Sequence, residues 1–270
     1  MTMDKTGLRT GILGALLWLC IGSAVADAPL TVDEIVQRTE QVAYYQGHDG
    51  RARVAMTITD GQGRTRKRRL TILRRDNEEA GVAGQRYFVH LQYPADVKNS
   101  IFMVWKHPDR DDDRWLYLPA LDLVRRIAAG DKRTSFLGSN FFYEDISGRS
   151  IAEDSHELLE TTDDYYVIDN VPRDPQGVAF SHYTMWVHRE SFIPVKAEYY
   201  DRQGEKYRVY EALAVETIQG YPTVTESRMQ DLRSGGETVL KFSRIDYDLD
   251  IPEEIFTERY LRQPPRQYLQ

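Results

Sequence analysis

Cysteine is almost absent from this chain, and its scarcity limits the chemistry that the protein can use. The one cysteine, Cys20, lies in an apolar stretch near the N-terminus. We predict that this stretch leaves with a secretory signal peptide, so the mature chain has no disulfide, no thiol nucleophile and no thiolate metal site. A secreted chain without disulfides needs a well-packed core instead.

The N-terminal segment has the parts of a signal peptide. Lys5 and Arg9 supply positive charge, an apolar run follows at 11–21, and Ala24-Val25-Ala26 forms an A-x-A cleavage site. This apolar run is too short for a stable membrane span. We therefore assign residues 1–26 to a cleaved signal peptide and residues 27–270 to a single domain.

The sequence also lacks the charge and the motifs of several function classes. Its net charge of −7 at pH 7 disfavours nucleic-acid binding, which requires a basic surface. No H-E-x-x-H pair, G-x-S-x-G elbow or phosphate loop occurs, and the acidic run 109–113 lacks the Gly and the final Glu of a calcium loop. We expect no metal, no cofactor and no catalysis, although an enzyme with an uncharted carboxylate site stays a possible alternative.

Alternating apolar and polar residues dominate the chain from residue 51 onward, as is typical of β-strands. Eleven such segments are predicted, at 51–59, 67–74, 86–92, 100–105, 114–119, 164–170, 182–188, 195–200, 206–214, 223–231 and 238–247. A helix is expected over 31–47, where Thr31 and Glu34 form a capping box, and shorter helical stretches are expected at 151–159 and 253–260. The fold class is therefore mainly β (α+β), built as an antiparallel meander.

A basic run stands out against the acidic chain, and two interpretations of it remain open. Its members are Arg64, Arg66, Lys67, Arg68, Arg69, Arg74 and Arg75. A charged edge strand that blocks unwanted pairing is one interpretation. A patch for anionic lipid headgroups or for an acidic partner is the other.

The segment 130–160 interrupts the alternation of strands, and the block from about residue 101 to 148 resembles a known family. The interrupting segment is rich in glycine and aromatic residues, which suggests a lid or plug packed on a sheet. The run 115–120, "WLYLPA", the run 124–127, "VRRI", and the run 135–145, "SFLGSNFFYED", resemble the outer membrane lipoprotein-sorting protein family of LolA-like type. Trp186-Val187 and residues 193–196, "IPVK", also match; Asn140 departs from the aspartate that is usual there.

This resemblance implies a LolA/LolB-like incomplete antiparallel β-barrel of about eleven strands, closed by a helical lid or plug. Its concave face would hold the acyl chains of a lipid or lipoprotein in the periplasm of a Gram-negative bacterium, with transfer to or within the outer membrane and transient contact with a membrane surface. The resemblance also implies a partner transporter of the resistance-nodulation-division (RND) type in the inner membrane. Burial of acyl chains contributes about 0.8 kcal/mol per CH₂ group, so an apolar concavity is a physically adequate carrier site.

We expect a defined set of large apolar residues to bind lipid. They are Val54, Met56, Ile58, Ile101, Met103, Trp105, Trp115, Tyr117 and Trp186 on the strands, with Phe136, Leu137, Phe141 and Phe142 in the plug. An ordinary filled core is the alternative for the same residues, since a slip of one residue turns every side chain of a strand to the other face. A periplasmic sensor or adaptor that binds a protein partner is the alternative function on the same fold.

Overall fold

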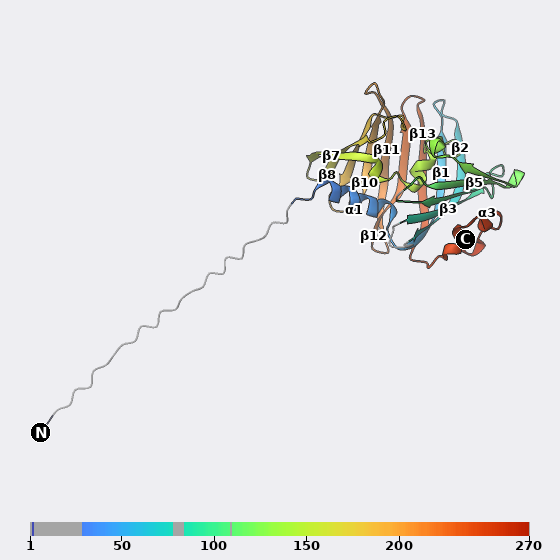
Figure 1. The fold of residues 1–270 in the computed structure, drawn as a ribbon, viewed down its shortest axis with the longest axis horizontal. Helices are drawn as coiled ribbons and strands as arrows, with labels where there is room; N and C mark the ends of the chain where they lie inside the picture. Colours follow the sequence, from blue (N-terminus) through green and yellow to red (C-terminus); the bar gives the residue numbers. More distant parts are fainter. Residues whose placement is uncertain (1, 3–28, 78–83, 109, 270) are drawn as a thin grey trace. The chain divides into compact units, whose positions relative to one another are not determined.

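The computed structural model describes residues 2, 29–77, 84–108 and 110–269, which nearly all belong to one folded unit that begins at Thr31 (Figure 1). The stretch predicted to be the signal peptide lies outside the described residues except for position 2. Among the described residues, no helix has the length and apolar character needed to cross a membrane.

One antiparallel sheet of thirteen strands forms the body of this unit, in the order β6-β5-β4-β3-β2-β1-β13-β12-β11-β10-β9-β8-β7. The strands are β1 (Asp49–Thr59), β2 (Thr65–Asn77), β3 (Gly84–Tyr93), β4 (Ile101–Lys106), β5 (Asp113–Leu118), β6 (Leu123–Ile127), β7 (Asp154–Thr161), β8 (Tyr165–Pro172), β9 (His182–His188), β10 (Pro194–Tyr200), β11 (Lys206–Ile218), β12 (Tyr221–Asp231) and β13 (Gly236–Tyr247). In the described part of the chain, β6 and β7 each pair on one side only. The sheet is therefore open, as expected for an incomplete barrel.

The eleven predicted strands are all present, but two edge strands were missed. The predicted helical stretch 151–159 is wrong, because it holds only the short 3₁₀ turn η4 (Ile151–Glu153) before the start of β7. Strand β6 was not predicted at all. Both edge strands are short and mostly exposed, so they carry little of the buried alternation that marks a strand in a sequence.

Hairpin turns set the register of the sheet. The turn between β1 and β2 is closed by a hydrogen bond from the Gly63 amide to the Asp60 carbonyl oxygen at 2.8 Å, and Gly63 has a φ of +77°. Glycine adopts this left-handed conformation without strain, so the turn pairs Thr59 with Thr65 and fixes the ladder that follows.

The predicted N-terminal helix is confirmed as α1 (Val32–Tyr44). The Thr31 amide donates to Glu34 Oε2 at 2.8 Å, and the Glu34 amide donates to Thr31 Oγ1 at 3.3 Å, which completes the capping box. Ile35, Val36 and Thr39 are its buried residues, and α1 contacts both β7 and β12. The helix thus covers the half of the sheet that contains the later strands (Figure 1). We call the face under α1 the inner face.

Residues 129–153, here called the plug segment, cover the other half of the inner face. They contain η3 (Ala129–Asp131), α2 (Tyr143–Ser147) and η4, and are otherwise irregular. Phe136 and Phe141 pack in a core with residues of β1, β2, β3 and β4. This segment packs against the sheet, but little of it is helical, so the predicted helical lid is not confirmed.

The basic run holds the plug segment in place. Arg66 Nη2 donates to the Gly138 carbonyl oxygen at 2.9 Å, and Arg68 Nε donates to the Leu137 carbonyl oxygen at 3.1 Å. The edge-strand interpretation of the run is wrong, because β2 lies between β1 and β3 in the interior of the sheet.

The outer face of the sheet has a second core under the C-terminal segment, residues 249–269. This segment contains η5 (Glu253–Phe256), α3 (Glu258–Arg262) and η6 (Arg266–Tyr268), so the helical stretch predicted at 253–260 is present in broken form. Asp49 is fully buried and accepts hydrogen bonds from the amides of Leu249 and Ile251, each at 2.7 Å. These bonds fix the chain as it leaves β13, and Figure 1 shows the C-terminal segment that follows. A separate 3₁₀ turn, η2 (Pro119–Leu121), joins β5 to β6.

Candidate functional site

An apolar cavity of about 400 Å³ lies between α1, the plug segment and the inner face of the sheet. This size falls in the range of roughly 300–1,000 Å³ that is usual for ligand sites. Its apolar lining comes from Val36 and Ala43 of α1, Phe141 and Ile146 of the plug segment, Ile72, Met185, Ala197, Val224, Met229, Leu240, Phe242 and Ile245 of the strands, and Ile193 of the β9–β10 turn. Methionine and aromatic residues adapt to flexible ligands, so the lining suits an acyl chain.

Five tyrosines, of which Tyr87 is buried and the others are half-buried, supply much of the remaining wall. Tyr44, Tyr87, Tyr183, Tyr199 and Tyr210 all line the cavity. Burial raises the pKa of Tyr210 to about 12 and holds the pKa of Tyr44 and of Tyr183 well above the usual value. Their hydroxyl groups therefore stay neutral at physiological pH, and Tyr183 donates to Asp154 Oδ2 at 3.0 Å.

The predicted lipid-binding residues divide between the two faces of the sheet. Val54, Met56, Ile58, Phe136 and Phe141 lie in the inner-face core, with Leu137 packed against it. Of the whole predicted set, Phe141 is the one that lines the cavity. Phe142 is half-buried, with the Arg208 guanidinium 4.0 Å from its ring centre.

The rest of the predicted set belongs to the outer face. Ile101, Met103, Trp105, Trp115 and Tyr117 pack against the C-terminal segment, where Trp105 Nε1 donates to the Phe256 carbonyl oxygen at 2.6 Å. Trp186 alternates with the cavity-lining Met185 and stacks with Lys196, whose ammonium lies 4.7 Å from the ring centre. The expectation that all these residues line one concavity is not met. Whether any of the thirteen contacts lipid stays a prediction.

The helix α1 and strands β9 to β13 supply most of the lining that sequence reasoning missed. Val36, Ile72 and Met185 each occupy an apolar position of their element's period, so the pattern that predicted the elements also contained them. The periodicity could not predict which of these residues line the cavity under α1 and which pack in the core under the plug segment.

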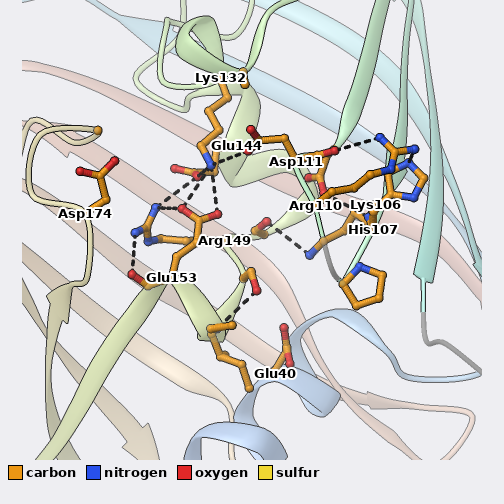
Figure 2. Close-up of a pocket in the computed structure, with 18 of the residues that line it drawn as sticks. Glu40, Lys106, His107, Arg110, Asp111, Lys132, Glu144, Arg149, Glu153 and Asp174 are labelled. Carbon is orange, nitrogen blue, oxygen red and sulfur yellow. Dashed lines mark hydrogen bonds and ion pairs between the residues drawn. The ribbon is translucent and has the colours of Figure 1, made fainter.

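A second, polar chamber of about 800 Å³ adjoins the cavity. Its walls are α1, the β4–β5 hairpin, the plug segment and the loop after β8 (Figure 2). Glu40, Arg149 and Ile151 line both the chamber and the cavity, so the two spaces meet at these residues. In the described part of the chain, no group of three or more acidic, histidine or cysteine side chains is arranged to hold a metal ion.

A network of ion pairs braces one wall of this chamber (Figure 2). Lys132 Nζ lies 3.3 Å from Glu144 Oε1 and 3.0 Å from Glu153 Oε1, while Arg149 lies 2.5 Å from Glu153 and 2.8 Å from Asp154. Burial works to raise the pKa of Glu144, but the cations beside it outweigh this effect and hold that pKa below its usual value. Each of these charges is already compensated within the network.

The fold and the site together define an open antiparallel sheet protein with an internal apolar cavity that opens into a polar chamber. A family model with the description "uncharacterized protein" matches residues 83–263, which is more than half of the chain. A search of curated proteins found no match.

Solved structures give a consistent picture of the family. A DUF1329 family protein from Desulfovibrio piger has 28% identity and a TM-score of 0.77, with 84% of this chain and 96% of that chain covered. An outer membrane lipoprotein-sorting protein domain from Vibrio parahaemolyticus has 26% identity and a TM-score of 0.77, with 85% and 97% covered. A LolA superfamily protein from Nitrosomonas europaea shares the fold, at 23% identity, a TM-score of 0.67, and coverage of 86% and 100%. The chain therefore belongs to a LolA-like family.

Proposed function

We propose that this protein is a carrier for a lipid or for the acyl chains of a lipoprotein in the periplasm, and that it catalyses no reaction. The observation that carries the proposal is the apolar cavity of about 400 Å³ that side chains leave unfilled. Each CH₂ group buried there contributes about 0.8 kcal/mol, so a single long acyl chain provides ample binding free energy.

The similarity to the Vibrio parahaemolyticus lipoprotein-sorting domain supports this reading of the cavity. A carrier of this kind works between membranes, so the protein reaches the periplasm by way of the predicted signal peptide at residues 1–26. We also propose an RND-type transporter in the inner membrane as its partner, on the strength of the family resemblance. In vivo crosslinking from exposed positions, followed by identification of the crosslinked protein, tests that partner.

Native mass spectrometry after gentle extraction tests the carrier function. The wild-type protein is expected to retain a lipid. Ala197→Trp should lower the retained lipid by about tenfold, because Ala197 is buried at the cavity wall and an indole there occupies ligand space. Ala128→Trp, at an exposed position outside the cavity, is the matched control and should retain lipid as the wild type does.

Two outcomes would overturn the proposal. Wild-type protein that neither retains lipid nor takes it up from vesicles is not a carrier. Full lipid retention by a folded Ala197→Trp variant would place the lipid elsewhere. Transfer of a labelled lipid from donor to acceptor vesicles then separates a carrier from a sensor, since a sensor binds lipid without delivering it.

A further inference from the structure

The polar chamber contains two buried cations that the ion-pair network does not use. Lys106 at the end of β4 is 8% exposed and Arg114 on β5 is 2% exposed, and both line the chamber. Val104 pairs with Arg114 in the sheet, so Lys106 and Arg114 are diagonal neighbours on the same face. Arg114 is paired with Asp112 at 2.6 Å, so Lys106 is the buried cation that an anionic ligand would neutralise.

The Lys106 ammonium has one N–H donor that is not used by the hydrogen bonds found in the structure. It donates to the carbonyl oxygens of Ser147 at 2.8 Å and Gly148 at 3.3 Å, but an ammonium has three N–H donors. Among the described residues Lys106 forms no ion pair, although the carboxylates of Asp112, Glu40 and Glu144 act on its charge. Figure 2 shows this side chain extending into the chamber from the hairpin.

Arg114 has an unused donor as well. Its Nη2 forms an ion pair with Asp112 Oδ2 at 2.6 Å, whereas its Nε is buried with no hydrogen-bond partner among the described residues. A buried donor that lacks a partner costs about 1–3 kcal/mol, so the surroundings of Arg114 carry a local energetic penalty.

An acidic residue marks the junction between the chamber and the cavity. Glu40 of α1 lines both spaces, and Figure 2 shows it in the chamber with Lys106. Glu40 and Lys106 attract each other electrostatically. A purely anionic group would be repelled by this carboxylate, whereas a group with an amine beside its anion would satisfy both residues.

We propose that the polar chamber binds the zwitterionic headgroup of an amphiphile whose acyl chain lies in the apolar cavity. The phosphate of a phosphoethanolamine-type headgroup contacts Lys106, next to the ion pair of Arg114 with Asp112, and its ammonium contacts Glu40. This assignment rests on the proposed carrier function, because it takes the cavity to be the site of the acyl chain.

Competition between three lipids with identical acyl chains tests the assignment. Purified, delipidated protein is mixed with equal amounts of phosphatidylethanolamine, phosphatidylglycerol and diacylglycerol, and native mass spectrometry measures which lipids bind. The wild type should prefer phosphatidylethanolamine to phosphatidylglycerol by about tenfold. Lys106→Met should lower the binding of both phospholipids and leave diacylglycerol unchanged, whereas Glu40→Gln should abolish the preference between the phospholipids.

The controls distinguish a failure of the headgroup assignment from a failure of the carrier function. Lys67→Met, at an exposed position of β2, should behave as the wild type. Equal binding of all three lipids by the wild type would overturn the headgroup assignment alone, whereas binding of none of them would overturn the carrier function itself. Soluble phosphoethanolamine should compete only weakly; competition as strong as that of the intact lipid would make the chamber a site for a small soluble ligand instead.

Discussion

Replacing Phe136 with alanine should show that the plug segment is part of the folded core and not a loose lid. The Phe136 ring is fully buried, and its centroid lies 5.5 Å from that of Phe102 and 5.4 Å from that of Tyr143. The Phe102 and Tyr143 rings are themselves 5.0 Å apart, so the three form one cluster between the plug and β4. Alanine would leave a void in the middle of it.

The expected loss follows from the burial of this ring. A fully buried phenylalanine truncated to alanine costs about 3–5 kcal/mol of the free energy of unfolding. For a domain of this size the same loss lowers the thermal midpoint by roughly 6–20 °C.

Urea denaturation followed by tryptophan fluorescence measures this free energy directly. Leu121→Ala is the control, because Leu121 is 70% exposed and its truncation should change the free energy by less than about 0.5 kcal/mol. A loss below about 1 kcal/mol for Phe136→Ala, with an unchanged m-value, would refute the reasoning. It would mean that the plug segment leaves the sheet at little cost and acts as a gate.

Two further predictions concern Lys106 and Gly148, which lie where the plug segment meets α1. Burial lowers the pKa of Lys106, so the folded state releases its proton before the unfolded state does. The wild type should therefore gain stability relative to Lys106→Met as the pH rises from neutral toward 10.5, and thermal melts of both proteins that shift in parallel would contradict this. Gly148 has a φ of +81° and an added Cβ would lie 2.6 Å from the Tyr44 ring, whereas Gly204 has a φ of +80° and open space around it. Gly148→Ala should thus lose more than the roughly 1–2 kcal/mol of backbone strain expected for Gly204→Ala, and equal losses in urea denaturation would exclude the clash.

The strands of the sheet could be predicted from the sequence because most of them show a buried and an exposed face. Strand β12 is a clear case, since Thr223, Thr225, Ser227 and Met229 are buried and alternate with half-buried neighbours. Side chains alternate between the two faces of every strand, so this pattern can be recognised in the strand's own sequence without knowing its neighbours. The capping box at Thr31 is equally local, and it was also predicted correctly.

The lining of the site could not be predicted, because the strand nearest to the motif is apolar on both faces. Every residue from Ile101 to Val104 is fully buried, so alternation does not tell which side chains point inward. Phe102 packs under the plug, while Ile101 and Met103 pack under the C-terminal segment. The C-terminal segment lies nearly 150 positions further along the chain. The face to which each side chain points therefore depends on the packing of both the plug segment and the C-terminal segment.

The two halves of the inner face also explain why an open sheet keeps a hollow. The plug segment fills the half over β1 to β4, whereas α1 bridges the other half and leaves about 400 Å³ unfilled. At about 24 cal/mol per Å³, an empty apolar void of that size would cost up to about 10 kcal/mol, which is comparable to the whole stability of a typical domain. Water at the junction with the chamber lowers that cost, but a larger side chain at the buried Ala197 would remove part of it directly. The ligand that we propose, with its acyl chain in the cavity and its headgroup in the chamber, would offset the cost of a hollow that simple substitutions could fill.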